Sequence, residues 1–495
     1  MPLIACLAAA SACSTIADDS ATENDPGSTD QDGTESSDGQ GAAEDPESDS
    51  SAEAGGDDDG AGLDQGRSAE ARPEVDEPLV PSITDRELTE RLSQLEGRLA
   101  VGNGPEVAVV RPDGARVDLL DGSESVVASQ PTWSHDGRRL AWSSISAVRQ
   151  VVLVQDFDDA GEQDGEPSST DAAGPPVFYL QWNEGDDRLA YIRNSANASA
   201  VEVGVFEPGL PVEPIGEGAP FFVSWSPAPD RLLGHVDELS IDAYDLAGEA
   251  DLGFTTVLPV SGGFSAPAWV DERRALIVDD GQLSYLDVGA GATEAIADIG
   301  GPVRFVLSPD RTKVAFQIIG GEAGPSLISQ PRAADGSQAS ITTVQAGQSG
   351  LIVLELATGE QTVVTEDLAV AWEWSPDSAM VAWLEAQIAD RQPIGRWNFW
   401  SDGVGPTTTR SSSFVISRKY GQAYLPFFAQ YAQSVTGWSP DSSAYAFAGT
   451  IDDDRGVWVQ LLSETVEPRL VTPGDFVTWG PGQPSAPDED TTAAA

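Results

Sequence analysis

Short apolar or alternating runs make up most of the chain after about residue 98. Runs of roughly four to eight such residues, bounded by Gly, Pro, Asp or Ser, predict β-strands joined by tight turns. Residues 151–154, 351–356 and 457–459 are three examples. The pattern therefore predicts an all-β fold for this part of the chain.

One helical pattern precedes the strands, within residues 82–97. Thr84 and Glu87 have the spacing of a capping box, which satisfies backbone N–H groups where a helix begins. Leucines recur one helical turn apart, at Leu88, Leu92 and Leu95. Gly97 is a typical stop signal. We expect this short N-terminal helix to pack its apolar stripe on the outer face of the β-region; partner binding is the alternative.

A motif recurs through the β-region: a strand that ends in Trp, a turn of the Ser-Pro-Asp-Gly type, and a strand of the form Arg-x-Leu-Ala-Trp. The first copy runs from Gln130 to Trp142. Pro presets φ, Asp bonds its own backbone and Gly takes the left-handed conformation, so the motif predicts a turn between antiparallel strands. We expect structural roles for the repeat tryptophans, which are Trp133, Trp182, Trp225, Trp269, Trp374, Trp438 and Trp479. Most of their spacings are close to the roughly 40–50 residues of one propeller blade.

This unit resembles the TolB-like, or WD40-like, propeller repeat of bacterial envelope proteins and of dipeptidyl-peptidase-like enzymes. The resemblance covers about residues 98–482 and implies a β-propeller of four-stranded blades. We expect eight blades, with seven as the alternative. The alternative stays open because Leu307 replaces one repeat Trp and the turns at 183–187 and 271–274 are degenerate.

The two ends of the repeat region predict how the ring closes. No strands follow the one at Trp479, whereas three strand patterns between residues 98 and 120 precede the first repeat Trp. Joined, these N- and C-terminal strands form one blade and leave no open edge.

Charge excludes one class of partner. The formal net charge is −55 at pH 7 and the pI is about 4.1. Because phosphate binding requires a basic surface, we expect no nucleic-acid partner. No stretch approaches the ~20 apolar residues of a membrane span, so we expect membrane contact only through a lipid anchor.

The start of the chain indicates such an anchor. Small residues precede Cys13, as at the end of a bacterial lipoprotein signal peptide, although a basic region before them is missing. We expect residues 1–13 to be a signal remnant and Cys13 to be lipidated. Residues 14–81 are mostly Asp, Glu, Ser, Gly and Ala, which predicts a disordered acidic tether. Residues 483–495 are expected to be a disordered tail, and the protein to be extracytoplasmic and lipid-anchored at the cell membrane.

Residues for catalysis are scarce. His135 and His235 are the only histidines, and no cysteine follows Cys13, so neither a three-histidine nor a thiolate metal site can form. No Gly-x-Ser-x-Gly elbow with a downstream His occurs, as a dipeptidyl-peptidase-like hydrolase would require. We expect structural roles for both histidines, no metal or cofactor, and no enzymatic activity.

Residues 388–433 form the one basic, aromatic stretch in this acidic chain. Aromatic residues with Arg are typical of protein interfaces. The candidate partner-contact residues are Arg396, Trp397, Phe399, Trp400, Tyr420 and Tyr424. The alternative is that their rings belong to ordinary blade strands and pack against neighbouring blades.

These observations favour a monomeric, non-catalytic propeller that binds or scaffolds a protein or peptide at the cell envelope. A glycan or small-ligand sensor that uses the axial mouth is the first alternative. A hydrolase-related propeller without its catalytic domain is the second.

Overall fold

The computed structural model describes residues 84–482 except 122–126, 147–149, 172–173, 197–199, 220, 229–230, 238, 247–253, 261–264, 300–302, 319–349, 390, 402–404 and 463–465. All described residues belong to one compact unit. The expected signal remnant with Cys13, the tether at 14–81 and the tail at 483–495 lie outside them. Among the described helices, none has the length and apolar character needed to cross a membrane.

Five sheets each consist of four antiparallel strands in sequence order. The first contains β4 (Val127–Trp133), β5 (Arg139–Ile145), β6 (Gln150–Asp156) and β7 (Ser168–Asp171). The second contains β8 (Val177–Trp182), β9 (Leu189–Asn194), β10 (Val201–Phe206) and β11 (Glu213–Gly218). The third contains β12 (Phe221–Trp225), β13 (Arg231–Val236), β14 (Ser240–Asp245) and β15 (Thr255–Pro259). The fourth contains β16 (Ala268–Trp269), β17 (Arg274–Asp279), β18 (Gln282–Asp287) and β19 (Ala292–Asp298). The fifth contains β20 (Val303–Leu307), β21 (Lys313–Ile318), β22 (Leu351–Glu355) and β23 (Gln361–Thr365).

Two further sheets depart from this form. One has the order β3-β2-β1-β32 and contains β1 (Leu99–Asn103), β2 (Glu106–Val110), β3 (Arg116–Asp121) and β32 (Phe476–Trp479). The other has eight strands in the order β24-β25-β26-β28-β29-β30-β31, with β27 paired to β26. Its strands are β24 (Ala371–Trp374), β25 (Met380–Ala389), β26 (Gln392–Ser401), β27 (Gly405–Arg410), β28 (Phe414–Ile416), β29 (Ala444–Ile451), β30 (Asp454–Leu461) and β31 (Arg469–Thr472). We call this eight-stranded sheet the fused sheet.

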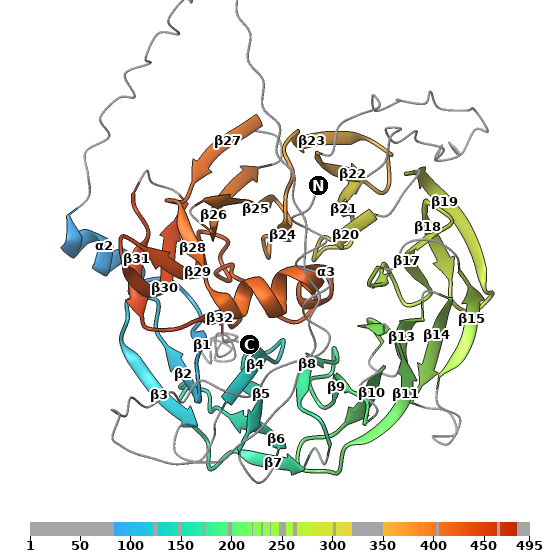
Figure 1. Cartoon of the computed structure of the whole chain (residues 1–495), viewed down its shortest axis with the longest axis horizontal. Helices are drawn as coiled ribbons and strands as arrows, with labels where there is room; N and C mark the ends of the chain where they lie inside the picture. The colour runs from blue at the N-terminus through green and yellow to red at the C-terminus, as the bar shows by residue number, and fades with distance from the viewer. Residues whose placement is uncertain are drawn as a thin grey trace, which may run out of the picture. The chain divides into compact units, whose positions relative to one another are not determined.

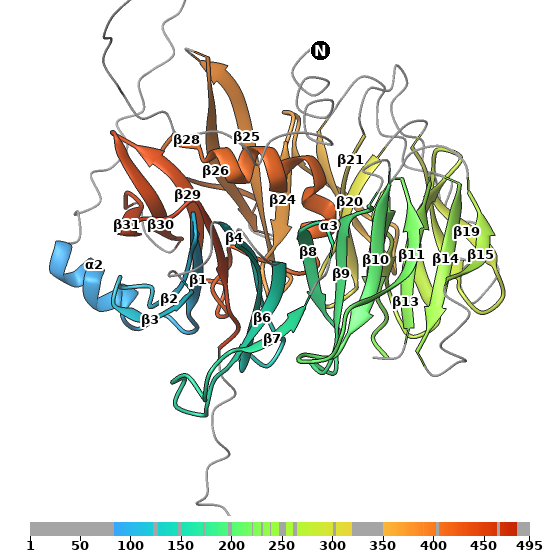
Figure 2. The same cartoon turned by 60° about the horizontal axis from the view of Figure 1, so that its bottom comes forward.

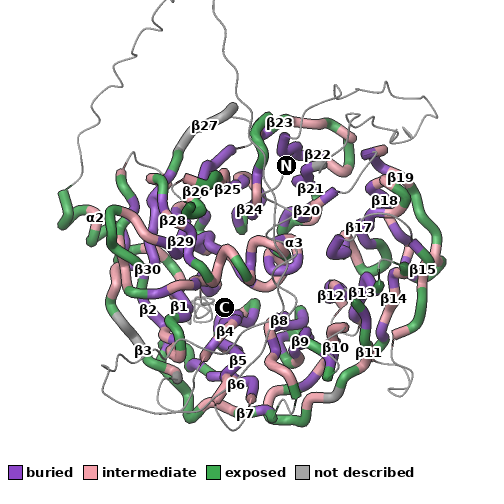
Figure 3. Tube along the Cα trace, in the orientation of Figure 1, coloured by how far each residue is buried: buried purple, intermediate pink, exposed green. Residues whose placement is uncertain are grey.

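The sheets follow one another around a common centre, with β4, β8, β20 and β24 among the strands nearest to it (Figure 1). Exposed residues are frequent on the outer strands β15 and β19, whereas inner strands such as β4 are mostly buried (Figure 3). This all-β arrangement of four-stranded antiparallel sheets is consistent with a β-propeller.

Indole groups join neighbouring sheets. Trp182 Nε1–H donates to the carbonyl oxygen of Thr132 (3.2 Å), and Trp225 Nε1–H donates to that of Gln181 (3.1 Å). In each case the acceptor directly precedes the repeat Trp of the previous sheet. The same bond runs from Trp269 to Ser224 and from Trp374 to Val306. All seven repeat tryptophans are buried. At these four positions the indole supplies a hydrogen bond that another large apolar side chain could not make.

The helix predicted within residues 82–97 is observed as α2 (Asp85–Leu92). Its capping box between Thr84 and Glu87 is present, as predicted. Leu92 is fully buried in a cluster with Leu99 and Trp479, and Leu88 and Leu95 pack against the same cluster. The helix is therefore anchored on the sheet that contains both β1 and β32.

After β28 the chain leaves the sheet pattern. It forms a π-helical turn (Tyr420–Tyr424), a 3-10 turn (Leu425–Phe427) and the short helix α3 (Phe428–Tyr431). We call residues 417–436 the central segment, because Figures 1 and 2 show α3 in the middle of the surrounding sheets.

Candidate functional site

The central segment hydrogen-bonds to the innermost strands of several sheets. The side-chain amide of Gln430 accepts from the N–H of Val223 (2.8 Å) and donates to its carbonyl (2.9 Å), as a neighbouring strand would. The hydroxyl of Tyr431 donates to the carbonyl of Phe178 (2.6 Å). These contacts attach the segment to β8 and β12.

Further contacts complete the attachment. Gln433 Nε2 donates to the carbonyl of Pro267 (3.1 Å), and Lys419 Nζ donates to that of Ala128 (2.9 Å). Phe428 is 1% exposed, and its ring centroid lies 4.5 Å from that of Trp372. The protein's own side chains therefore fill the axis at the level of α3.

Four of the predicted contact residues lie in the core instead. Trp397, Phe399, Trp400 and Tyr424 are only 1–3% exposed. The ring of Tyr445 packs against Trp397 and Phe399, at centroid distances of 4.7 and 5.5 Å. Because a partner cannot reach rings buried between strands, the contact interpretation is wrong for these four side chains. They belong to blade strands and to the central segment, as the alternative interpretation stated.

The other two predicted contact residues are more accessible. Arg396 donates to Ser413 Oγ (2.8 Å) and is partly buried. Tyr420 is also partly buried, and its ring stacks on that of Tyr424 at 4.5 Å. The structure does not bring the six residues together on one surface.

Glu373, a buried carboxyl group on β24, holds the end of the central segment. Its Oε1 accepts from the hydroxyl of Tyr424 (2.8 Å) and its Oε2 from the N–H of Gly437 (2.9 Å). Burial raises the pKa of Glu373 above its ordinary value, although these hydrogen bonds act to lower it. Glu373 directly precedes Trp374, a position where the other repeats carry no carboxylate.

A pocket of about 260 Å³ lies where the inner strands meet their turns. We call it the turn-side pocket. Its wall includes Trp133, His135, Trp182, Gln433, Thr436 and Trp479. The central segment thus forms one wall, and the ends of β4, β8 and β32 form the rest. Polar groups among apolar rings are typical of a small-ligand site.

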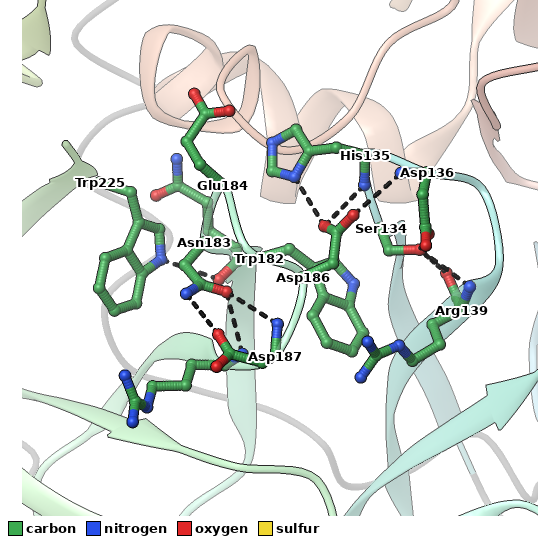
Figure 4. Close-up of polar contacts among 12 residues, drawn as sticks. Ser134, His135, Asp136, Arg139, Trp182, Asn183, Glu184, Asp186, Asp187 and Trp225 are labelled. Carbon is green, nitrogen blue, oxygen red and sulfur yellow. Dashed lines mark hydrogen bonds and ion pairs between the residues drawn. The ribbon is translucent and has the colours of Figure 1, made fainter. Parts of the chain in front are cut away.

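His135, on the rim of this pocket, bonds a carboxylate of the next sheet (Figure 4). Its Nδ1 and its backbone N–H both donate to Asp186 Oδ1, each at 2.8 Å, and the N–H of Asp136 donates to Oδ2 (2.9 Å). Burial lowers the pKa of His135, but the hydrogen bond and charge of Asp186 outweigh it, and the pKa lies above 6.5. The same bonds lower the pKa of Asp186, although burial raises it.

The pair joins two neighbouring turns. Ser134 Oγ donates to Asp136 Oδ1 (2.7 Å). Among the described residues, no hydroxyl group hydrogen-bonds to the His135 ring. His235 is buried on β13, with Nδ1 bonded to the carbonyl of Ser265 (2.9 Å). The described part of the chain contains no group of three or more His, Cys, Asp or Glu placed to hold a metal ion.

Sequence reasoning missed Asp186, Glu373 and Gln430. Asp186 occupies the left-handed turn position (φ 53°) in a turn that was recognised only as degenerate. Glu373 could have been noticed as a carboxylate beside a repeat Trp. Nothing in the sequence pattern marks Gln430, because its role depends on where the inserted segment crosses the molecule.

Comparison with known proteins gives similarity only to solved structures. No family model and no curated protein matches the sequence. A eukaryotic initiation factor is similar over 79% of this chain and 100% of its own, with 10% identity and a TM-score of 0.49. TolB from Acinetobacter baumannii is similar over 54% of this chain and 65% of its own, with 14% identity and a TM-score of 0.31. A Myceliophteria thermophila β-propeller domain, Swd1, matches over 58% of this chain and 86% of its own, with 11% identity and a TM-score of 0.34. These likenesses assign no function to this chain.

Proposed function

We propose that the chain is a monomeric, non-catalytic β-propeller, lipid-anchored through Cys13 outside the cytoplasm, that binds a protein partner at the cell envelope. The lipid anchor and the location are supported by the residues around Cys13 and by the acidic composition of residues 14–81. The envelope setting is also what the TolB-like repeat implies.

We infer eight blades. The fused sheet divides at β28 into β24–β27 with Trp374 and β29–β31 with Trp438. The bridge between Trp438 and Tyr445 supplies the inner edge of the second set. These two sets, the five regular sheets and the sheet of β1–β3 and β32 make eight, and the β1–β32 pairing is the closure that we propose.

One observation carries the binding proposal: the hairpin of β25 and β26 projects beyond the neighbouring sheets (Figure 2). The two strands pair without interruption from Met380↔Ser401 to Ala389↔Gln392. Near the tip, Ile388 is 49% exposed, and Arg391 is also exposed. β28 braces the hairpin by pairing with β26. A rigid projection with an exposed apolar side chain is suited to contact with another protein.

The test is cross-linking mass spectrometry in intact cells with a carboxyl-reactive reagent. We expect one dominant envelope protein, linked near the hairpin tip. A variant in which an Asn-Gly turn replaces residues 388–393 keeps the inner hairpin pairing, from Gln387↔Ile394 inward, and should lose this partner. Its melting temperature is the control for folding. Absence of any partner above background for the unaltered protein would refute the proposal.

The turn-side pocket favours a second candidate, a glycan or small-ligand sensor. Titration of the purified protein with peptidoglycan fragments tests it, with Gln433→Ala as the variant that changes the pocket wall. Saturable binding that this substitution weakens would support the sensor. Binding that it leaves unchanged, or no saturation, would argue against this pocket.

A further inference from the structure

Side chains three positions before the repeat tryptophans reach the central segment from the inner strands. On β4 and β8 these residues are Gln130 and Tyr179, which hydrogen-bond Tyr431 (2.9 Å) and Gln430 (3.1 Å). On β20 the equivalent residue is Arg304. Arg304 therefore approaches the same helix α3, but as a cation.

The Arg304 guanidinium lies over the ring of Phe428, with its carbon 5.6 Å from the ring centroid. The side chain is partly buried, and no carboxylate among the described residues pairs with it. Arg193, in contrast, pairs with Glu202 at 2.8 Å. Burial lowers the pKa of Arg304, with no neighbouring acid to oppose the shift. Because hydrogen bonds between a guanidinium and a carboxylate are charge-assisted and can be bidentate, a ligand carboxylate would be stabilising here.

Aromatic side chains accompany this cation. Phe427, next to Phe428 in the chain, is 42% exposed, although most rings of the central segment are buried. Its ring packs edge-on against that of Phe222 on β12, with 6.3 Å between the centroids. Phe427 directly precedes Phe428, the residue that Arg304 contacts, and aromatic rings with an arginine are the composition of a binding hot spot.

We propose that Arg304, Phe427 and Phe222 form a receptor for the C-terminus of a partner polypeptide. Arg304 would bind the terminal carboxylate, and the two rings would contact the last apolar side chain. Charge favours a chain terminus over an acidic stretch, because a protein of net charge −55 repels clustered negative charges at long range. The inference rests on the proposed function, since it specifies how a protein partner would be recognised.

Peptide binding to the purified full chain tests the receptor. The probe is an array of N-acetylated hexapeptides of varied sequence that end in leucine, as the free carboxylate or as the C-terminal amide. We expect the amides to bind at least about tenfold more weakly, because they lose charge-assisted hydrogen bonds. Amidated peptides with an internal Glu should bind as weakly as the other amides.

Variants assign the effect to these residues. Arg304→Gln should reduce binding of the carboxylate form to the level of the amide, and Arg304→Lys should give an intermediate affinity because the planar fork is lost. Phe427→Ala should weaken binding of both forms. Arg111→Gln, at an exposed arginine, is the matched control and should change nothing.

Equal binding of acid and amide, binding of neither, or full binding by Arg304→Gln would overturn the inference. Cell cross-linking separates this failure from failure of the proposed function. A partner that Arg304→Gln still captures would refute the receptor and leave the scaffold function standing. Carboxylate-dependent peptide binding without any cellular partner would leave the receptor standing and refute the function.

Discussion

The five regular sheets and the fused sheet are held together by different kinds of contact. Between regular sheets, the indole bonds run from one repeat to the next, as from Trp225 to Gln181. In the fused sheet, β28 pairs with both β26 and β29, so two strand sets that would otherwise meet only through side chains share a backbone ladder. The central segment that follows β28 then reaches distant sheets, including Val223 on β12.

The repeats and the insertion therefore have different structural roles within one fold. Repeat residues join each sheet to its neighbour, so every copy performs the same local role. The insertion, which consists of β28 and the central segment, occurs once. Its strand β28 braces the projecting hairpin, and the central segment fills the axis. A repeat can therefore tolerate loss of one Trp, as at Leu307, whereas the insertion has no second copy to replace it.

The largest expected effect comes from removal of β32. A chain that ends at Asp475 loses the four pairings of β32 with β1, together with buried Phe476 and Trp479. Each buried ring contributes about 3–5 kcal/mol, which together approach the whole stability of a typical domain. We expect this chain to be largely unfolded by circular dichroism and thermal melting.

A chain that ends at Gly482 is the length control, since it keeps all described strands. We expect it to melt like the full chain. An unchanged melting curve for the chain that ends at Asp475 would contradict the proposed closure of the ring by β1 and β32.

Trp397→Ala tests whether the fused sheet is a core or a contact surface. Trp397 is 1% exposed and packs on Tyr445, so we expect a loss of about 3–5 kcal/mol in urea unfolding. Ile388→Ala, at the exposed hairpin tip, should change stability by no more than about 0.5 kcal/mol. Equal stabilities for the two variants would mean that Trp397 is not a core residue.

The sequence predicted the repeated sheets well. It predicted hardly anything about how the central segment crosses the middle of the molecule. Trp-to-turn units are local patterns, and the regular sheets with their buried tryptophans follow from them. The capping box of α2 is equally local. The course of residues 417–436 depends on contacts with strands more than a hundred residues away, such as Gln430 with Val223. Periodicity carries no information about such contacts, and the same aromatic composition serves a core or an interface.

Replacement of single indoles by phenylalanine sharpens the comparison between the regions. Trp225 donates its N–H to a carbonyl, whereas Trp438, fully buried in the fused sheet, has no hydrogen-bond partner for Nε1 among the described residues. Both substitutions remove the same atoms. Trp225→Phe should therefore cost about 1–2 kcal/mol more than Trp438→Phe, because it leaves the Gln181 carbonyl unsatisfied. Equal losses in denaturant unfolding would show that the indole bonds do not stabilise the regular sheets.

The smallest expected effect concerns pH and the His135–Asp186 pair. The pKa of His135 is raised above 6.5, mainly by Asp186, with Glu184 and Asp136 adding negative charge. The pair therefore contributes its full stability below pH 6.5 and loses it as pH rises through the folded-state pKa. Because the imidazole is 49% exposed, the contribution should be at most about 1 kcal/mol.

Asp186→Ser is the matched variant, because serine already occupies the equivalent turn position at Ser378. Ser378 also has a positive φ (59°), and its Oγ accepts a backbone N–H of the preceding sheet, from Asp310 (3.0 Å). The substitution should thus keep the backbone contact between turns and remove the ion pair. Urea unfolding at pH 6 and pH 9 should give a larger fall in stability for the natural chain than for the variant. The same fall in both would mean that another group titrates, and that the regular sheets depend on the turn backbone alone.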